Sequence, residues 1–214
     1  IAVGNGTGGR ETVRWLGEIE GPVPPVVSVN ESGASVYSAS NAAREEFPDH
    51  DVTVRGAISI GRRLLDPLSE LVKIDPASIG VGQYQHDIDP KLLERRLEET
   101  VESCVNLVGA DLNTASPHLL RFISGVSERV ARAIVEYRSR AGGFASRGEL
   151  LDVPGVGAKT YEQAAGFLRV RGGEQPLDAT AIHPERYELV CRMVRDLGKS
   201  LDSVVGNEEA VKRI

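Results

Sequence analysis

The segment VPGVGAKTYEQA, residues 153–164, places a glycine-containing turn directly before a stretch of helix-forming residues. The segment ISGVSERVARAI, residues 123–134, carries the same pattern 30 residues earlier. In both copies the turn consists of an apolar residue, Pro or Ser, Gly, a second apolar residue, and Gly or Ser. Each copy predicts two helices joined by a tight turn, so the repeat indicates a compact helical domain built from two hairpins.

The chemistry of this turn suits a phosphate group. Glycine adopts a positive φ without strain and lets another molecule approach the main chain closely. The helix that follows begins with N–H groups that lack partners and carry partial positive charge, and such groups bind phosphate oxygens. We therefore predict that the nucleic-acid-binding residues are Gly155, Val156, Gly157, Lys159 and Thr160 in the second copy, and Gly125, Val126, Ser127 and Arg129 in the first.

The residues of each copy have separate predicted roles. The central valine anchors the turn in the core, and the basic residue at the start of the helix reaches a neighbouring phosphate. Ser127 or Thr160 adds a hydroxyl donor. Ser127 also stands where the second copy has Gly157, so its side chain narrows the approach to the first turn. The alternative is that one or both hairpins only pack helices against each other.

The charge distribution is uneven. The chain carries a formal charge of −6, which at first argues against nucleic acid. However, residues 117–172 contain nine Lys or Arg and five Asp or Glu, a local charge of +4 that leaves −10 for the remainder. A basic segment in an acidic chain indicates a nucleic-acid footprint. We expect its arginines to be mostly solvated helix ends, some of which contact phosphate: Arg138, Arg140, Arg147, Arg169 and Arg171.

The first 76 residues alternate strand-like and helical segments, which is typical of an α/β sheet. Strands are expected at residues 1–3 and 26–29, helices at 10–18 and 35–47, a short extended piece at 52–54, and a helix at 57–73 that breaks at Asp66-Pro67. Two or three strands are too few to stand alone, so this segment is expected to be the second half of a larger domain. Because residue 1 is Ile, we also expect the chain to be a fragment of a longer protein.

The rest of the chain is expected to be helical. Residues 77–110 should form a glycine-containing connector and a helix, residues 111–172 the two hairpins, and residues 173–214 a helical linker toward a downstream domain. The helix that begins at Asp89-Pro90 shows one apolar face, which includes Cys104. No run of about 18 apolar residues occurs, so no membrane span is expected. The fold class is therefore mixed: a partial α/β segment followed by a mostly helical domain.

The segment GNGTGG, residues 4–9, follows an apolar triplet and matches the G-x-G-x-x-G pattern of dinucleotide-binding loops. Glu31, after the second expected strand, stands where that fold has an acidic residue for the ribose. A dinucleotide-binding fold would continue with further parallel strands, whereas this chain becomes helical. We therefore disfavour a nicotinamide or flavin enzyme.

Longer segments resemble known families. VPGVGAKTYEQA resembles the helix-hairpin-helix motif closely and ISGVSERVARAI more weakly; with EYRSRAGGFASRGELL between them, they resemble the tandem hairpin domain of bacterial competence DNA receptors. Four blocks resemble consecutive parts of the Tex family of bacterial transcription accessory proteins: IAVGNGTGGRET, VVSVNESGASVYSAS, RGAISIGRRLLDPLSELVKIDPASIGVGQYQHDID and LNTASPHLLRFISGVSERVA. This resemblance implies that residues 1–76 belong to a YqgF-type domain with a ribonuclease H-like fold, and that an S1 domain would lie beyond residue 214.

The same resemblance raises the question of a nuclease. RuvC-type and YqgF-type nucleases cluster carboxylates around divalent metal, and Glu31 and Asp66 match two positions of that cluster. A third carboxylate would lie upstream of residue 1. Such a site would use Mg²⁺ or Mn²⁺, but the family resemblance implies a domain that is often catalytically silent. The alternative roles are a helix cap for Asp66 and a surface turn for Glu31, so we expect no resident cofactor.

The leading hypothesis is a cytoplasmic, nucleic-acid-binding transcription accessory factor that grips the DNA or RNA backbone without regard to sequence. The first alternative is a metal-dependent nuclease. The second is a helical scaffold that binds protein partners such as RNA polymerase. The sequence does not distinguish DNA from RNA or single from double strands.

Overall fold

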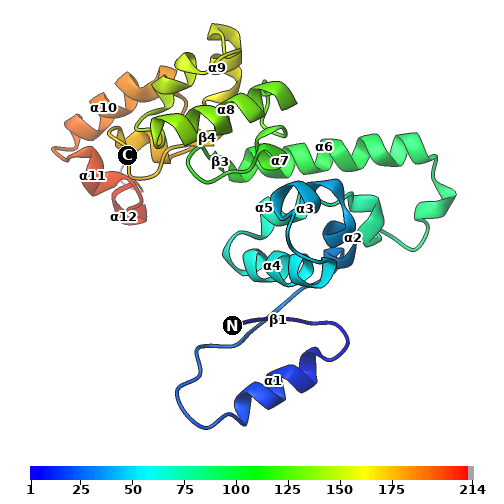
Figure 1. Cartoon of the computed structure of the whole chain (residues 1–214). Helices are drawn as coiled ribbons and strands as arrows, with labels where there is room; N and C mark the ends of the chain where they lie inside the picture. Colours follow the sequence, from blue (N-terminus) through cyan, green and yellow to red (C-terminus); the bar gives the residue numbers. More distant parts are fainter. Residues whose placement is uncertain (212–214) are drawn as a thin grey trace. The chain divides into compact units, whose positions relative to one another are not determined.

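The computed structural model describes residues 1–211 and divides the chain into two compact units, Ile1–Glu99 and Thr100–Ile214 (Figure 1). The division falls within the long helix α6 (Pro90–Val108). Among the described residues, no helix has both the length and the apolar character needed to cross a membrane. The mixed fold expected from the sequence is confirmed: strands occur with helices at the start of the chain, and helices dominate the remainder.

The first unit begins with a parallel pair of short strands, β1 (Ala2–Gly4) and β2 (Val27–Val29), in which Ala2 pairs with Val27 and Gly4 with Val29. Helix α1 (Gly9–Gly17) follows β1 and lies in the connection between the two strands. The parallel pairing with an intervening helix agrees with the predicted α/β segment.

Four helices follow β2: α2 (Ala34–Ala39), α3 (Asn41–Glu46), α4 (Val52–Leu65) and α5 (Pro67–Leu71). The single helix expected at 35–47 is interrupted at Ser40, whose extended backbone and side chain cap α3 by accepting the N–H of Ala43. The extended piece expected at 52–54 was wrong. Asp51 accepts the N–H groups of Thr53 and Val54, so these β-branched residues form the first turn of α4.

Buried polar contacts join α2 to α5 in this unit. The Lys73 ammonium lies 2.9 Å from a Glu46 oxygen and 2.7 Å from a Glu70 oxygen. Tyr37 donates its hydroxyl to Glu46, and Ser59 donates to Glu70. The buried charges of Lys73 and Glu70 therefore have partners, as burial requires.

The connector contains two short 3₁₀ turns, η1 (Pro76–Ile79) and η2 (Gln85–Asp87). Asp89 caps α6 as predicted, because it accepts the N–H of Leu92. The expected apolar face of α6 is only partly buried: Val105 is inaccessible, whereas Val108 and Cys104 are exposed.

The second unit contains the predicted hairpins. Its elements are β3 (Ala110–Asp111), α7 (Pro117–Leu120), α8 (Glu128–Ala141), η3 (Arg147–Asp152), α9 (Ala158–Ala164) and β4 (Leu168–Arg169). The two-residue strands, which were not expected, pair in parallel and bracket the hairpins. The core between them consists of fully buried apolar side chains, which include Leu112, Leu120, Ile123, Ile134, Leu150 and Leu168.

The last segment is also helical, with η4 (Pro176–Ala179), η5 (Pro184–Arg186), α10 (Tyr187–Asp196), α11 (Leu201–Val204) and α12 (Glu208–Val211). His183 caps η5, which leads directly into α10, and Gly198 follows the helix with a φ of 67°. His183 also donates its Nε2 hydrogen to the Glu162 carbonyl of α9 at 2.9 Å. The last segment therefore contacts the second hairpin.

Candidate nucleic-acid interface

The two hairpin turns have the same backbone geometry. Gly125 and Gly155 adopt φ values of 83° and 90°. In each turn the following valine donates its N–H to the carbonyl three residues back, at 2.9 Å for Val126 and 3.0 Å for Val156. A positive φ is costly for residues with a Cβ, so both turns require glycine.

The helix starts after the two turns differ. Ser127 accepts the Val130 N–H with its side-chain oxygen at 3.3 Å and so caps α8. Gly157 is the N-cap of α9 and has no side chain, and no side chain among the described residues caps that helix. The first-turn N–H groups of α9, including that of Thr160, therefore keep their capacity to donate.

The corner of the second turn faces solvent. Pro154, Gly155 and Gly157 are exposed, and Val156 is half-buried. Lys159 is exposed on the first turn of α9, and Thr160 is half-buried beside it. In the first turn Gly125, Ser127 and Arg129 are exposed, while Val126 is 6% exposed and anchors the turn as the sequence predicts.

Packing between the hairpins also differs at the two glycines. A Cβ on Gly125 would lie 2.8 Å from Gln163 Cβ and 3.1 Å from Gln163 Oε1 on α9. A Cβ on Gly155 would lie 3.5 Å from Arg129 Nη2, which is ordinary contact. The first turn is thus pressed against α9, whereas the second turn has the Arg129 guanidinium beside it.

The sequence predicted Arg129 as a phosphate-binding residue, but it did not predict which turn the side chain lies beside. Arg129 follows the first turn in the sequence, but its side chain reaches the second turn. Each turn lies against a helix of the other hairpin: the first against α9 and the second against the start of α8. This arrangement is visible only in the folded structure. Lys159 and Arg129 therefore supply positive charge on one corner rather than on two.

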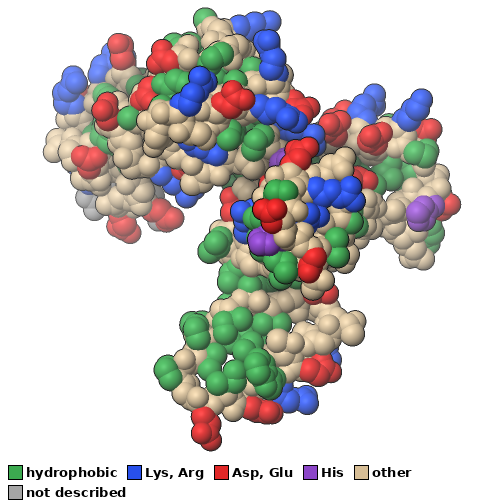
Figure 2. Space-filling view, viewed as in Figure 1, with side chains coloured by type: hydrophobic (Ala, Val, Ile, Leu, Met, Phe, Trp, Pro, Cys, Tyr) green, Lys and Arg blue, Asp and Glu red, His purple; other side chains and the backbone are tan. Residues whose placement is uncertain are grey.

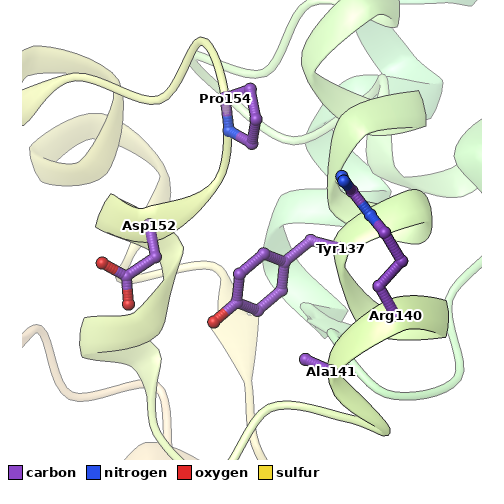
Figure 3. Close-up of a pocket in the computed structure, with 5 residues that line it drawn as sticks. All are labelled: Tyr137, Arg140, Ala141, Asp152 and Pro154. Carbon is purple, nitrogen blue, oxygen red and sulfur yellow. The ribbon is translucent and has the colours of Figure 1, made fainter.

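An open hollow of about 370 Å³ adjoins the second turn (Figure 3). Its lining residues come from the end of α8, the end of η3 and the turn itself: Tyr137, Arg140, Ala141, Asp152 and Pro154. Sequence reasoning did not identify the hollow, because its walls come from segments more than ten residues apart.

Three arginines of the basic segment are not solvated helix ends, contrary to the sequence prediction. Arg147 is 1% exposed and Arg169 is 7% exposed. Arg138 donates to the carbonyls of Leu112 and Ala115 at 3.0 and 2.8 Å. Arg147 and Arg169 are therefore not available to phosphate, and Arg138 is half-buried and held by backbone carbonyls inside the unit. Arg140 and Arg171 remain exposed.

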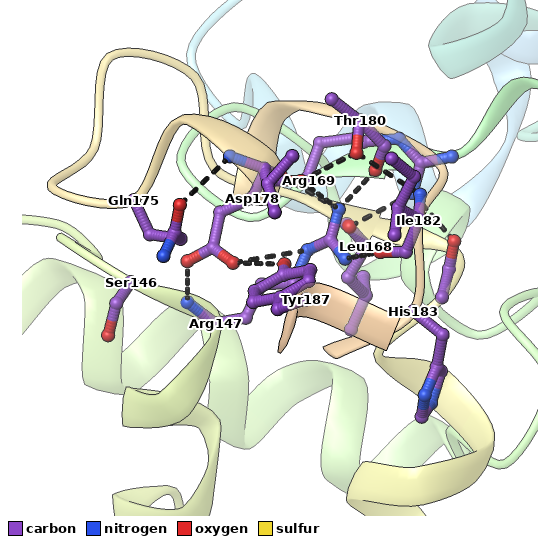
Figure 4. A network of polar contacts seen from close by, with 12 residues as sticks. Ser146, Arg147, Leu168, Arg169, Gln175, Asp178, Thr180, Ile182, His183 and Tyr187 are labelled. Atoms are coloured by element: carbon purple, nitrogen blue, oxygen red, sulfur yellow. Dashed lines mark hydrogen bonds and ion pairs between the residues drawn. The ribbon is translucent and has the colours of Figure 1, made fainter. Parts of the chain in front are cut away.

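Arg147 is the centre of a buried polar network (Figure 4). Its guanidinium donates to the carbonyls of Ile182, Asp178 and Thr180, and its backbone N–H donates to the Asp178 carboxylate at 2.8 Å. The Tyr187 hydroxyl donates to the same carboxylate. Burial, and then this hydrogen bond, raise the pKa of Tyr187, so the phenol remains a donor at neutral pH. The network fixes the last segment against η3.

The basic side chains do not form a single positive field. On the face seen in Figure 2, Lys and Arg side chains alternate with Asp and Glu over the hairpin unit. Binding at this unit would therefore depend on local contacts at the turns more than on long-range attraction.

The two residues of the predicted nuclease cluster have other contacts. Asp66 caps α5: one oxygen accepts the Ser69 N–H at 3.0 Å, and the other accepts the Ser69 hydroxyl at 2.6 Å. Glu31 lines an open hollow of about 480 Å³ between α2 and α4, whose other lining residues bring no second carboxylate. Residues 1–211 contain no group of three His, Cys, Asp or Glu residues placed to hold a metal ion. The described residues alone therefore do not supply a complete set of ligands for Mg²⁺ or Mn²⁺.

Glu31 also explains the glycines of the GNGTGG loop. A Cβ on Gly4 would lie 2.0 Å from one Glu31 oxygen, and a Cβ on Gly6 would lie 1.7 Å from the other. The glycines thus make room for a carboxylate. A carboxylate at this loop would repel the pyrophosphate of a dinucleotide.

Comparison with known proteins agrees with this architecture. Residues 1–65 match the family model "Tex protein YqgF-like domain", residues 105–169 match "Helix-hairpin-helix motif", and residues 175–214 match "HHH domain". All of this chain aligns at 55% identity with the transcriptional accessory protein Tex of Neisseria gonorrhoeae. This chain belongs to the Tex family. Protein YhgF of Escherichia coli is 50% identical, and the human S1 RNA-binding domain-containing protein 1 is 35% identical, each over the whole chain.

The chain spans 27% to 29% of the length of these Tex-family relatives. The family resemblance inferred from the sequence blocks is confirmed, as are the YqgF-like and helix-hairpin-helix segments. Residues 173–214 were expected to be a helical linker, and the model "HHH domain" matches most of them. Sequence analysis had no signal for this match, because that segment has no glycine turn of the PGVG kind.

Proposed function

We propose that this Tex-family chain belongs to a cytoplasmic transcription accessory factor and binds the sugar-phosphate backbone of nucleic acid at its second hairpin turn. The observation that carries the proposal is the exposed corner from Pro154 to Gly157, which leads into an uncapped helix start. Relatives named for transcription and for an S1 RNA-binding domain support the same assignment.

Two kinds of contact would act together at this corner. Backbone N–H groups at the start of α9 would donate to a phosphate oxygen. Lys159 and Arg129 would provide the positive charge that neutralises it. Because every nucleotide carries the same phosphate, binding would be independent of sequence and would weaken steeply with salt.

The first turn would contribute less. Its helix start is already capped by Ser127, and its glycine is packed against α9. Gly125 and Ser127 remain exposed, and the Ser127 hydroxyl still has a hydrogen to donate. We propose that the first hairpin mainly positions the second and adds at most a peripheral contact.

The proposal is tested in the full-length protein by substitutions at the corner. Lys159→Glu should lower the affinity for unrelated DNA and RNA sequences alike, and Lys159→Ala should reduce the slope of log K against log salt by about 1. Lys91→Glu, at an exposed position of α6, reverses the same charge elsewhere and should have little effect.

Gly155→Asp should also lower the affinity, because a carboxylate would face the phosphate. Gly198→Asp is the matched control: Gly198 has a φ of 67°, is exposed and follows α10, so it carries similar backbone strain but belongs neither to the corner nor to the hollow beside it. Unchanged binding in both Lys159→Glu and Gly155→Asp would refute the proposed function.

Two alternatives are separated by companion assays. A protein scaffold for RNA polymerase would give a positive pull-down with no gel shift at low salt. A nuclease would give a product that depends on Mg²⁺ or Mn²⁺ and disappears in Glu31→Gln. No observation on the described residues favours either alternative over backbone binding.

A further inference from the structure

The hollow beside the second turn shares one residue with the proposed phosphate site. Pro154 lines the hollow and immediately precedes Gly155. A strand held by its phosphate at the turn would therefore bring a neighbouring nucleotide to the mouth of the hollow. The volume of about 370 Å³ falls within the range of small-ligand pockets, about 300–1,000 Å³.

The Tyr137 ring forms a half-buried wall of this hollow (Figure 3). Its orientation is fixed from behind by Phe144, which is buried, with the two ring centroids 5.0 Å apart. An aromatic ring that is held in place and open on one side stacks well with a base, because little side-chain freedom is lost on binding.

The polar side chains of the hollow suit the edge of a base. Asp152 is exposed at the end of η3 and offers two carboxylate oxygens that only accept hydrogen bonds. Loss of hydration, and then the carboxylates of Asp152 and Glu149, raise the pKa of Tyr137, so the phenol hydrogen is retained as a donor.

A carboxylate distinguishes among the bases. Guanine presents two N–H donors side by side on one edge, which match the two oxygens of a carboxylate. Adenine and cytosine present an amino group beside an acceptor, and uracil and thymine present one N–H between two carbonyls that a carboxylate repels. These donors are used in base pairs, so only an unpaired base could offer them.

Arg140 lies at the rim of the hollow. It is exposed on the last turn of α8, and Figure 3 shows its side chain extending along the opening toward the level of Pro154. Its guanidinium is placed to contact the phosphate of the inserted nucleotide or to lie against the face of the base. It also offsets the negative charge that Asp152 brings close to the strand.

We propose that this hollow binds one unpaired base, guanine in preference to the others, of the strand whose phosphate the second turn holds. The inference rests on the proposed function and deepens it: backbone contact is independent of sequence, and the hollow adds a preference for single strands and for one base.

The test measures fluorescence anisotropy with the full-length protein, using single-stranded and duplex oligonucleotides in RNA and DNA form. Tyr137→Leu should lower single-strand affinity by about 5- to 100-fold and leave duplex affinity unchanged. Tyr137→Phe, which keeps the ring, should retain single-strand affinity. Tyr84→Leu, at an exposed tyrosine of the connector, is the matched control and should change neither.

Base preference is tested with uniform strands that carry one guanine. The wild type should bind them more tightly than strands without guanine, in RNA and DNA alike, because the hollow contacts the base. Asp152→Asn should remove this preference, while the affinity for strands without guanine stays equal or rises, since a negative charge is lost. A single 6-thioguanine in the strand should cross-link to the peptide that contains Tyr137.

The inference would be overturned if Tyr137→Leu lowered the affinity for single strands and duplexes equally. It would also be overturned if Asp152→Asn left the guanine preference unchanged. If Gly155→Asp lowers binding while the Tyr137 and Asp152 variants behave as wild type, only the base-binding hollow is wrong. If Gly155→Asp and Lys159→Glu both bind normally, the proposed function itself fails. The Tyr137→Phe and Asp152→Asn variants keep the test decisive if Tyr137→Leu does not fold.

Discussion

The two hairpins have the same turn but use it differently. In the first, a Gly125 side chain would collide with Gln163, and Ser127 satisfies the helix start. In the second, the space around Gly155 is open and Gly157 leaves the helix start without a cap. The comparison shows that a glycine turn can serve packing in one copy of a repeat and remain open to a ligand in the other.

Contacts between the hairpins account for this division of roles. The first turn is pressed against α9, which contains the open helix start, and Arg129 at the start of α8 lies beside the second turn. The first hairpin therefore orients the second and adds a charge to its corner. Substitutions at the first turn should mainly change stability, and substitutions at the second turn should mainly change binding.

The largest expected effect concerns the attachment of the last segment to η3 of the second hairpin. Arg147→Met removes the guanidinium that donates to four backbone carbonyls and leaves the buried Asp178 without its cation. We expect the free energy of unfolding to fall by about 3–5 kcal/mol in urea denaturation. Amide exchange should increase more in α9 and the last segment than in α8. A loss below about 1 kcal/mol, or equal exchange in α8 and α9, would contradict this account.

The next effect separates the two glycines directly. Gly125→Ala combines a positive φ with a contact of 2.8 Å to Gln163 Cβ, so it should cost about 2–4 kcal/mol. Gly155→Ala meets only ordinary contacts and should cost about 1–2 kcal/mol. Urea denaturation of both variants measures the difference. Equal costs would show that the first turn is not more tightly packed than the second.

A smaller effect is expected at the cap of α8. Ser127→Ala removes the acceptor of the Val130 N–H and should lower the free energy of unfolding by about 1 kcal/mol. Its affinity for nucleic acid should stay close to that of the wild type, because the first turn contributes little binding. A large loss of affinity with no loss of stability would assign the phosphate contact to the first turn instead.

Local sequence signals predicted the features that depend on a few neighbouring residues. The turns at Gly125 and Gly155, the cap at Asp89 and the break at Asp66-Pro67 follow from side chains that act within one helical turn. The same reasoning failed at residues 52–54. There the strand preference of Val-Thr-Val was overridden by the cap at Asp51. Strands β3 and β4 have two residues each, which is too short to show a period.

Parts of the candidate site could not be predicted, because they depend on contacts between distant segments. Counting charges treated Arg147 and Arg169 as surface residues, although both are buried and bind carbonyls. The reach of Arg129 to the second turn and the hollow beside Pro154 both require the packing of one hairpin on the other. The repeat therefore predicted the residues of the two turns. It did not predict that the two turns have different roles.

The smallest change gives the sharpest test of the central claim, that the open start of α9 holds phosphate. Gly157 has an extended backbone, and no described atom lies within 4 Å of its Cβ position, so Gly157→Ser should fold without strain. The new hydroxyl oxygen would cap α9 as Ser127 caps α8, adding a few tenths of a kcal/mol of stability.

The decisive measurement is the affinity of the full-length protein for a single-stranded oligonucleotide across a salt series, for the wild type, Gly157→Ser and Ser127→Gly. The account predicts that Gly157→Ser binds about tenfold more weakly, because one amide donor to the charged phosphate is lost, and that Ser127→Gly binds as well as the wild type or better. Unchanged affinity in Gly157→Ser together with a loss in Ser127→Gly would contradict it.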